Sequence, residues 1–120
     1  NNVVAEIISY FRKKITTLRA KGIEQIIIDP GFGFGKTLDH NYQILTKLEE
    51  FNQFNIPVLV GTSRKSMIYK LLDEKPKDAL NGTSITNTMA LLKGASILRV
   101  HDVKEAIECI KITTFAKNLA

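Results

Sequence analysis

The sequence predicts an α/β fold in which amphipathic helices alternate with short buried strands. The chain has 120 residues, of which 44% are hydrophobic and 24% charged, which is typical of one globular domain. Such alternation favours parallel strands joined by right-handed crossovers. The predicted strands end at Asp29, Gly61 and Arg99, at separations of 32 and 38 residues. A complete eight-stranded barrel uses about 31 residues per unit, so the spacing fits part of a barrel, although an open doubly wound sheet gives similar intervals.

The first elements are a helix over residues 3–21 and a strand over residues 26–28. Apolar residues recur at three- and four-residue steps from Val4 to Leu18, which is the pattern of an amphipathic helix. Gly22 follows a basic last turn and predicts the helix end. The unbroken β-branched run at 26–28 predicts a strand covered on both faces.

The second unit repeats this order. Apolar spacing predicts a helix over residues 40–53 and a strand over 57–61. A further helix opens at residues 63–66 and runs to about residue 72, and Pro76 interrupts the helical pattern.

The third unit begins with a predicted turn at Asn81-Gly82, after which Thr83 or Ser84 caps a helix that reaches Gly94. Asn81-Gly-Thr83 also matches a glycosylation acceptor, but without a secretory signal we interpret it as a turn and cap. A strand over 96–100 and a last helix over 103–117 complete the chain. The residues of that helix predicted to point inward are Ala106, Ile107, Ile110 and Phe115.

Charge and cysteine content indicate a cytoplasmic protein. Seventeen Lys and Arg against twelve Asp and Glu give a net charge of +5, which favours anionic partners without choosing among them. No segment resembles a membrane span or a signal peptide. The single cysteine, Cys109, forms no internal disulfide and is expected to be a packed or idle thiol. The chain lacks an initiating Met and opens inside a predicted helix, so we expect it to be a piece of a longer protein.

Three polar segments follow the predicted strands, at residues 29–36, 61–66 and 99–102. In parallel α/β folds the carboxyl ends of the strands face one side and bind ligands there. Helix capping by Asp29 or Ser63 is the simpler alternative at any single junction. All three junctions together favour a ligand site.

The glycine-rich segment 29–36 matches neither of the common nucleotide motifs. A P-loop requires a glycine where this chain has Pro30, and the dinucleotide motif fails because Gly31, Gly33 and Gly35 alternate. Alternating glycines with intervening phenylalanines instead suit a mobile loop that covers a flat ligand with an aromatic ring.

The charged residues at the strand ends suggest particular contacts. Asp29 offers two acceptor oxygens to a ring with adjacent N–H donors. Lys65 is either a solvated helix-start residue or a donor to a ligand, and its strand-end position favours the ligand. Arg99 and His101 emerge on one face of an extended segment and can form a phosphate clamp, although His101 could instead make a structural hydrogen bond, for example to Asp102. His40 has no partners at metal-ligand spacing and is interpreted as a helix-start residue.

Taken together, Asp29-Pro-Gly-Phe-Gly-Phe-Gly-Lys36, Ser63-Arg-Lys-Ser66 and Arg99-Val-His-Asp-Val103 resemble segments after strands six, seven and eight of the dihydropteroate synthase family of folate biosynthesis. The likeness covers nearly the whole chain, in order. It implies that residues 1–120 are a partial pterin-binding domain, truncated at its N-terminal side: the C-terminal portion, about strands 6–8, of a (β/α)8 TIM barrel.

The resemblance also implies an activity and residue roles. The family condenses 6-hydroxymethyl-7,8-dihydropterin diphosphate with p-aminobenzoate, giving 7,8-dihydropteroate and diphosphate. By resemblance, Asp29 and Lys65 bind the pterin, and Arg99 and His101 hold the diphosphate; Lys65, Arg99 and His101 are the expected catalytic residues. Phe34 and Ser66 line the p-aminobenzoate and sulfonamide pocket.

For the parent protein the resemblance implies Mg²⁺, whose protein ligand lies outside this chain, and a homodimer through its last helices. No metal ligand, nucleic-acid partner or membrane partner is expected of this piece, which alone should be inactive. The alternatives are a corrinoid-linked methyltetrahydrofolate methyltransferase, which has no diphosphate to hold, a basic module that binds nucleic acid or anionic surfaces, and a noncatalytic relative that keeps only the scaffold.

Overall fold

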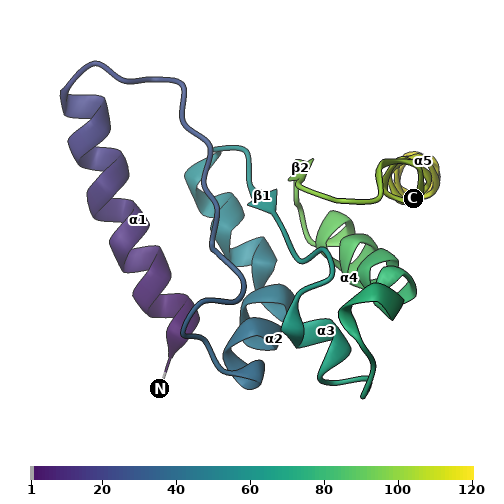
Figure 1. Cartoon of the computed structure of the whole chain (residues 1–120). Coiled ribbons are helices and arrows are strands. Elements are labelled where there is room, and N and C mark those ends of the chain that lie inside the picture. Colours follow the sequence, from purple (N-terminus) through teal and green to yellow (C-terminus); the bar gives the residue numbers. More distant parts are fainter. Residues whose placement is uncertain (1) are drawn as a thin grey trace.

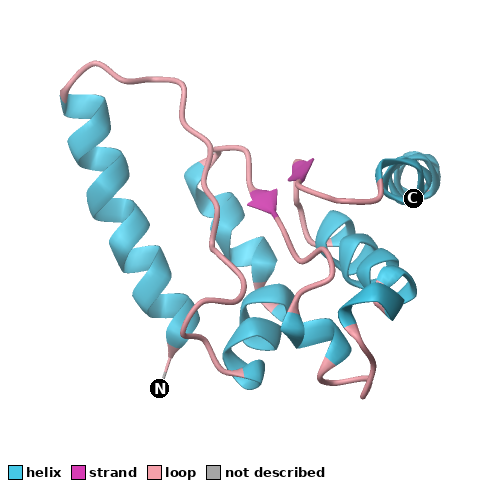
Figure 2. Ribbon diagram, in the orientation of Figure 1, coloured by secondary structure: helices cyan, strands magenta, loops and turns pink. Residues whose placement is uncertain are grey.

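Helices dominate the computed structural model, which describes residues 2–120, and two very short strands lie between them (Figures 1 and 2). Asn2 caps the first helix, because its side chain accepts a hydrogen bond from the Ala5 amide. The helices and 3₁₀ segments are α1 (Val3–Ala20), α2 (Leu38–Thr46), η1 (Leu48–Phe54), α3 (Ser66–Tyr69), η2 (Pro76–Asp78), α4 (Leu80–Leu92) and α5 (Val103–Leu119). The strands are β1 (Leu59–Val60) and β2 (Ile97–Leu98).

The strands pair in parallel and in chain order, as predicted, but they are much shorter than the sequence suggested. β1 and β2 pair with Leu59 opposite Ile97, and residues 26–28 contribute a single parallel bridge, Ile28 to Val58. The prediction that residues 26–28 are covered on both faces is wrong for Ile27, whose side chain is 54% exposed. The order and direction confirm an α/β architecture, while one edge of this small sheet carries exposed apolar surface.

The core lies between the strands and the helices α1, α2 and η1. Ile44, Leu45 and Phe51 are completely buried, and α1 packs on them with the face that carries Val4 and Ile8. The same apolar spacing that predicted these helices therefore selects their buried faces.

Two helices differ from their predicted lengths. The helix expected over 40–53 divides into α2 and η1 at Lys47, and a left-handed Asn55 (φ 54°) ends it. The helix expected to reach residue 72 comprises only α3, and Asp73 follows it with φ of 55°.

The predicted turn at Asn81-Gly82 and the cap at Thr83 or Ser84 are wrong, because α4 begins at Leu80 and includes all four residues. Gly82 is buried where a Cβ atom would collide with Ile68, so its small size serves helix packing and not a turn. The Thr83 hydroxyl donates to the Ala79 carbonyl inside the helix.

The inward face of α5 is also not the predicted one. Ala106 is buried as expected, together with Cys109 and Thr113, all facing α4. Ile107 and Ile110 are exposed, and Phe115 is 70% exposed. Short side chains on the buried face allow α5 to approach α4 closely, and the bulky apolar side chains are left on the outside.

The molecule is open in outline. Its Cα radius of gyration is 15.0 Å, whereas a compact chain of this length has about 14 Å. α1 and α5 lie at opposite ends in Figure 1, and α5 packs mainly on α4. None of the helices in residues 2–120 is long and apolar enough to cross a membrane.

Candidate functional site

The carboxyl ends of β1 and β2 meet, as predicted, and form one pocket, which no residue of the segment 29–36 lines. The first pocket, of about 130 Å³, is lined by Gly61, Ser63, Lys65, Arg99, Val100 and His101. Its residues come from the segment after β1 and the segment after β2, because the parallel pairing places both carboxyl ends on the same side. Three of the predicted site residues, Lys65, Arg99 and His101, are thus brought together.

Arg99 lies over Gly61 and pairs with Asp29. A Cβ atom on Gly61 would lie 2.7 Å from the Arg99 Nη2 atom, so the guanidinium occupies space that only glycine leaves free. Arg99 Nη1 donates to Asp29 Oδ2 at 3.1 Å, and the other oxygen, Oδ1, accepts from the Gly31 amide at 2.9 Å. The two residues predicted to bind different parts of a ligand are therefore direct neighbours, and both are exposed.

His101 bonds to Ser63 and not to Asp102. The Ser63 Oγ atom lies 2.7 Å from Nδ1 of the imidazole and also accepts the His101 backbone N–H at 3.2 Å. These two contacts fix the ring relative to the segment after β1. The alternative of a structural hydrogen bond for His101 is therefore realised with Ser63, and the partner given as its example, Asp102, is bound by Arg64.

Lys65 is half-buried, and its Nζ atom donates to the Phe32 carbonyl at 2.9 Å. Burial lowers the pKa of its ammonium group, and the positive charges of Arg99 and Lys36 lower it further, against the opposing effect of Asp29. Lys65 lines the first pocket and also an adjoining second pocket, so it can contact ligand groups in each.

The second pocket adjoins the first at Lys65 and has a volume of about 370 Å³. It contains Phe34 and Ser66, the two residues predicted to share a pocket, and the Phe34 side chain is 98% exposed. The other residues that line it are Phe32, Gly33, Arg64, Lys65, Tyr69 and Pro76. An exposed aromatic ring at the rim of a pocket is suited to covering a flat ligand.

Hydrogen bonds hold the glycine-rich segment at several points, and the Phe34 side chain projects from it. Gly31, Gly33 and Gly35 all have positive φ angles, which explains their alternation in the sequence. The buried Asn41 side chain accepts the Gly33 N–H at 2.9 Å and donates to the Thr37 carbonyl at 3.0 Å. Asn41 therefore anchors the segment to α2 and leaves Phe34 projecting.

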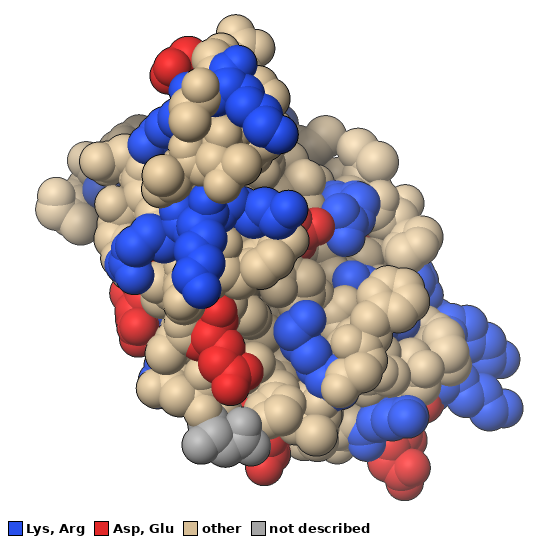
Figure 3. All heavy atoms as spheres, turned by 90° about the vertical axis from the view of Figure 1, so that its left-hand side faces the viewer, with Lys and Arg blue, Asp and Glu red and all other residues tan. Residues whose placement is uncertain are grey.

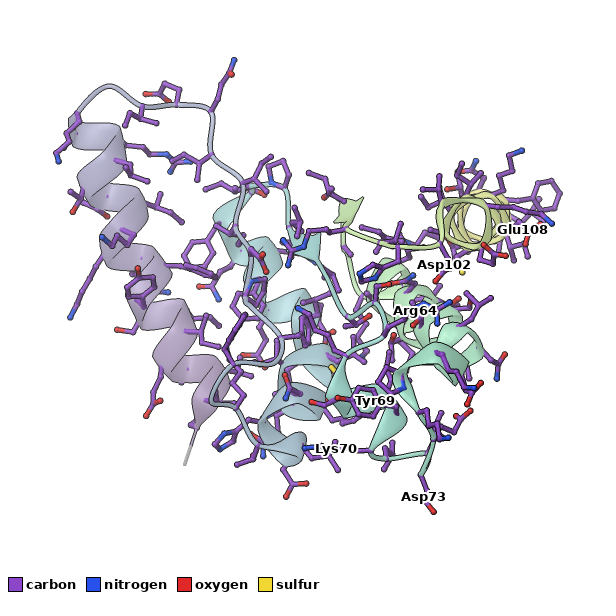
Figure 4. The ribbon with its side chains drawn as sticks, viewed as in Figure 1. Arg64, Tyr69, Lys70, Asp73, Asp102 and Glu108 are labelled. Carbon is purple, nitrogen blue, oxygen red and sulfur yellow. The ribbon has the colours of Figure 1, made fainter. Side chains whose placement is uncertain are left out.

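Arg64 links three segments that the sequence separates. Its guanidinium binds both carboxylate oxygens of Asp102 and also donates to the carbonyls of Pro76 and Lys77. Figure 4 shows Arg64 directed toward Asp102 at the start of α5. The hydrogen bonds from Arg64 lower the pKa of the Asp102 carboxyl, with a further contribution from the charge of Arg64. Arg64 has a left-handed backbone (φ 55°), a conformation rare for a side chain of this size.

Sequence reasoning therefore missed the roles of Ser63, Asn41 and Arg64. Ser63 and Arg64 lie in a segment that it had identified, but their partners are 38 residues away in the chain. Asn41 had one usable signal, since it is a polar residue three and four positions before Ile44 and Leu45 and so lies on the apolar face of its helix.

Within residues 2–120 there is no group of three or more His, Cys, Asp or Glu side chains that could hold a metal ion. His40 lies on α2 and does not line the first pocket. Cys109 is buried on α5, where its thiol donates to the Ser84 carbonyl.

The chain is similar in sequence to a family of pterin-binding enzymes and to several of its members. Residues 1–101 match a family model described as pterin binding enzyme. The chain is 47% identical over 114 residues to the dihydropteroate synthase of Escherichia coli (strain K12), covering 93% of this chain and 40% of that protein. It is 43% identical over 113 residues to the enzyme of Haemophilus influenzae, covering 92% and 41%. The chain therefore spans about two fifths of the length of these curated relatives.

Solved structures agree. A Yersinia pestis dihydropteroate synthase with a pterine-sulfa conjugate superposes with a TM-score of 0.97 at 40% identity, covering 100% of this chain and 48% of that one. A Coxiella burnetii dihydropteroate synthase in complex with pteroic acid superposes with a TM-score of 0.93 at 39% identity, covering 98% and 45%.

Proposed function

The chain belongs to the pterin-binding enzyme family, and from this premise we propose that it is part of a dihydropteroate synthase of folate biosynthesis. The whole protein would condense 6-hydroxymethyl-7,8-dihydropterin diphosphate with p-aminobenzoate. The observation that carries the proposal is the meeting of Lys65, Arg99 and His101 in one pocket, beside a second pocket with Phe34 and Ser66.

We propose that residues 1–120 are a partial domain corresponding to about strands 6–8 of a (β/α)8 barrel. The parallel pairing in chain order supports this placement. The exposed Ile27 and the open outline of the molecule also support it, because further strands would cover that edge. The chain alone is expected to be inactive, since it would supply only one side of the barrel's ligand site.

In this proposal the first pocket binds the diphosphate. Arg99 supplies a fixed positive charge with a planar set of donors, and His101 adds a further donor from the adjacent wall. Asp29 accepts hydrogen bonds from the pterin ring when Arg99 turns toward the diphosphate. Lys65, between the two pockets, contacts the pterin and borders the p-aminobenzoate site.

The chemistry follows from this placement. The bond between the pterin methylene carbon and the diphosphate oxygen breaks, and its electron pair leaves with the diphosphate. Donors placed around that oxygen stabilise the charge that develops on it. The aniline nitrogen of p-aminobenzoate, held by Phe34 and Ser66, then forms the new C–N bond and loses a proton. Holding both reactants side by side reduces the entropic cost of their meeting.

The resemblance implies Mg²⁺ with the diphosphate, but the residues of this chain do not fit it as ligands. Residues 2–120 offer no cluster of carboxylates or imidazoles for a metal, and Asp29 is engaged by Arg99. We therefore expect the ion's protein ligand to lie elsewhere in the parent protein, and the bond-breaking and bond-forming steps are assigned without it.

We further propose a cytoplasmic homodimer for the parent protein, assembled through its C-terminal helices. The exposed apolar side chains of α5 support this, because surface of that kind is usually covered by a partner. Those most exposed are Ile112, Phe115 and Leu119.

The nucleic-acid alternative has little support. On the face that carries α1, Lys and Arg side chains are spread over the surface with Asp and Glu between them, without a continuous basic stripe (Figure 3). The cations that line the two pockets, in contrast, converge from separate loops.

The test uses the full-length protein that contains this chain. Isothermal titration should show binding of the pterin diphosphate and none of comparable strength for methyltetrahydrofolate, and an assay with p-aminobenzoate should show dihydropteroate. Lys65→Ala or Arg99→Ala should each lower kcat/KM by about 10- to 100-fold, the value of a hydrogen bond to a charged group. Preference for methyltetrahydrofolate would favour the methyltransferase, and unchanged activity in both variants would contradict the assigned roles.

A further inference from the structure

We propose that Ser63 is a positioning residue that keeps the His101 ring in the tautomer with its proton on Nε2, so that this N–H is presented to the diphosphate. The proposal rests on the proposed function of the first pocket. It concerns a hydroxyl to which neither the resemblance nor the proposed function assigns a role.

The hydrogen-bond geometry around Ser63 favours one arrangement of protons. Its Oγ atom receives the backbone N–H of His101 at 3.2 Å, and a backbone amide can only donate. The hydroxyl therefore acts as the acceptor in that bond and still has its own proton to place. Nδ1 of His101, at 2.7 Å, is the acceptor within its reach in the described part of the chain.

The burial of the Ser63 hydroxyl supports this arrangement. Ser63 is only 5% exposed although it borders the first pocket, and a buried hydroxyl without a partner is costly. If Nδ1 carried a proton, whether in the other neutral tautomer or in the imidazolium, the Ser63 hydroxyl would lose its acceptor. The neighbouring Thr62 offers no substitute, since its hydroxyl bonds to Thr86.

The consequence for the pocket is a directed neutral donor. A neutral imidazole whose Nδ1 accepts from Ser63 must carry its proton on Nε2. Arg99 and Lys65 already bring positive charge to the same pocket. His101 can then add a hydrogen bond to the diphosphate without adding a third cation that would repel the other two.

Nuclear magnetic resonance of the full-length protein tests the tautomer directly. With ¹⁵N-labelled histidine, long-range ¹H–¹⁵N correlations distinguish a protonated from an unprotonated ring nitrogen, and His101→Gln identifies the signals. We expect Nε2 protonated and Nδ1 unprotonated at neutral pH. A proton on Nδ1 in the unmodified protein would overturn the proposal, whatever the enzyme's activity.

Variants test the link to ligand binding. Ser63→Ala should shift the His101 Nδ1 resonance toward the value of an unprotonated ring nitrogen that accepts no hydrogen bond. The same variant should bind inorganic diphosphate about tenfold more weakly. Ser63→Thr, which keeps the hydroxyl, should restore both. Thr62→Val removes the adjacent buried hydroxyl and should leave the His101 spectrum unchanged.

The outcomes separate this proposal from the proposed function. A protein that shows these spectra and binds diphosphate but forms no dihydropteroate would contradict the function and leave the role of Ser63 intact. If a folded Ser63→Ala protein binds diphosphate as tightly as the unmodified protein does, the role of Ser63 is contradicted. The proposed function is unaffected by that result. If Ser63→Ala does not fold, the tautomer of the unmodified protein decides.

Discussion

Arg64 and Asp102 are joined by two hydrogen bonds, Nε to Oδ2 at 3.0 Å and Nη2 to Oδ1 at 3.1 Å, across 38 residues of sequence. Asp102 occupies the N-cap position of α5, but its side chain makes no capping bond to that helix. Its carboxylate instead ties the start of α5 to the segment after β1. This pair therefore holds the loops that carry Lys65 and His101 at a fixed separation.

We expect the Arg64–Asp102 pair to make the free energy of unfolding depend on pH in the acidic range. Its hydrogen bonds lower the pKa of Asp102 in the folded protein from the ordinary value of 3.8. The stabilisation is thus fully present above pH 3.8 and is lost as the pH falls through the lowered folded-state value. Urea unfolding of the full-length protein from about pH 7 to about pH 2 should show Asp102→Asn less stable than the unmodified protein at neutral pH, with the difference shrinking in strong acid.

Glu49→Gln is the matched control, because it removes the exposed Glu49–Lys93 ion pair, which shares no residue with the Arg64–Asp102 pair. Exposed pairs contribute little, so this variant should follow the unmodified protein across the pH range. A difference for Asp102→Asn that stays constant into strong acid would show that the carboxylate charge is not what matters.

Lys65 should react with acylating reagents at lower pH than an exposed lysine. Only the neutral amine reacts, and burial together with the charges of Arg99 and Lys36 lowers the pKa of Lys65 below its ordinary 10.5. Competitive labelling followed by mass spectrometry should give a reaction midpoint below that of the exposed Lys13.

Variants of its neighbours should move that midpoint in opposite directions. Arg99→Gln removes a positive charge and should raise it, whereas Asp29→Asn removes the opposing negative charge and should lower it further. A midpoint equal to that of Lys13 in all three proteins would contradict this account.

Gly61→Ala should impair the site while leaving the fold intact. The three atoms nearest to the added Cβ all belong to the flexible end of Arg99, which can move aside but then leaves its position over the pocket. We expect the KM for the pterin diphosphate to rise about tenfold, the value of one hydrogen bond to a charged group, with the melting temperature nearly unchanged.

Gly82→Ala provides the contrast, since its Cβ would collide with Ile68 and Leu72 inside the fold. Overpacking of this kind costs about 1–3 kcal/mol, so the melting temperature should fall. If Gly61→Ala lowers the melting temperature as much as Gly82→Ala does, its effect on KM cannot be assigned to Arg99.

Phe34→Ala should change binding of p-aminobenzoate without changing stability. The ring is 98% exposed, so its loss should alter the free energy of unfolding by less than about 0.5 kcal/mol. Stacking between aromatic rings contributes about 0.5–1.5 kcal/mol, which predicts a KM for p-aminobenzoate about 2- to 10-fold higher. Steady-state kinetics and urea unfolding measure both quantities.

Phe32→Ala is the control two residues away, because that ring is 2% exposed and lies in the core. Its removal should cost about 3–5 kcal/mol. An unchanged KM for p-aminobenzoate in Phe34→Ala would exclude a direct contact with this substrate.

The sequence predicted the features that depend on local patterns. α1 and α5 begin at residues 3 and 103, as expected from apolar spacing and polar breaks, and they end within two residues of the predicted positions. The meeting of the three strand ends was also predictable, because parallel strands place their carboxyl ends on one side. The positions of residues along the chain were sufficient to predict both the helix bounds and the meeting of the strand ends.

The predictions from sequence were wrong where one local pattern is compatible with two structures. Asn81-Gly82 has the composition of a turn, but Gly82 lies within α4 and makes room for Ile68. Ile107 and Ile110 have the apolar character of core residues, but the side of α5 that faces α4 carries smaller side chains. The conformational propensity of a residue depends on that residue and its near neighbours in sequence. Its packing depends on which other helix or strand contacts it in the folded protein.

What the sequence determined by itself was the order of helices and strands and the set of charged residues at the strand ends. Only the tertiary structure decided their partners: Asp29 with Arg99, Ser63 with His101, and Arg64 with Asp102. Each pair joins residues at least 38 positions apart. A hydrogen bond requires donor and acceptor within about 3 Å, a condition that pairing of the strands creates and that no local pattern encodes.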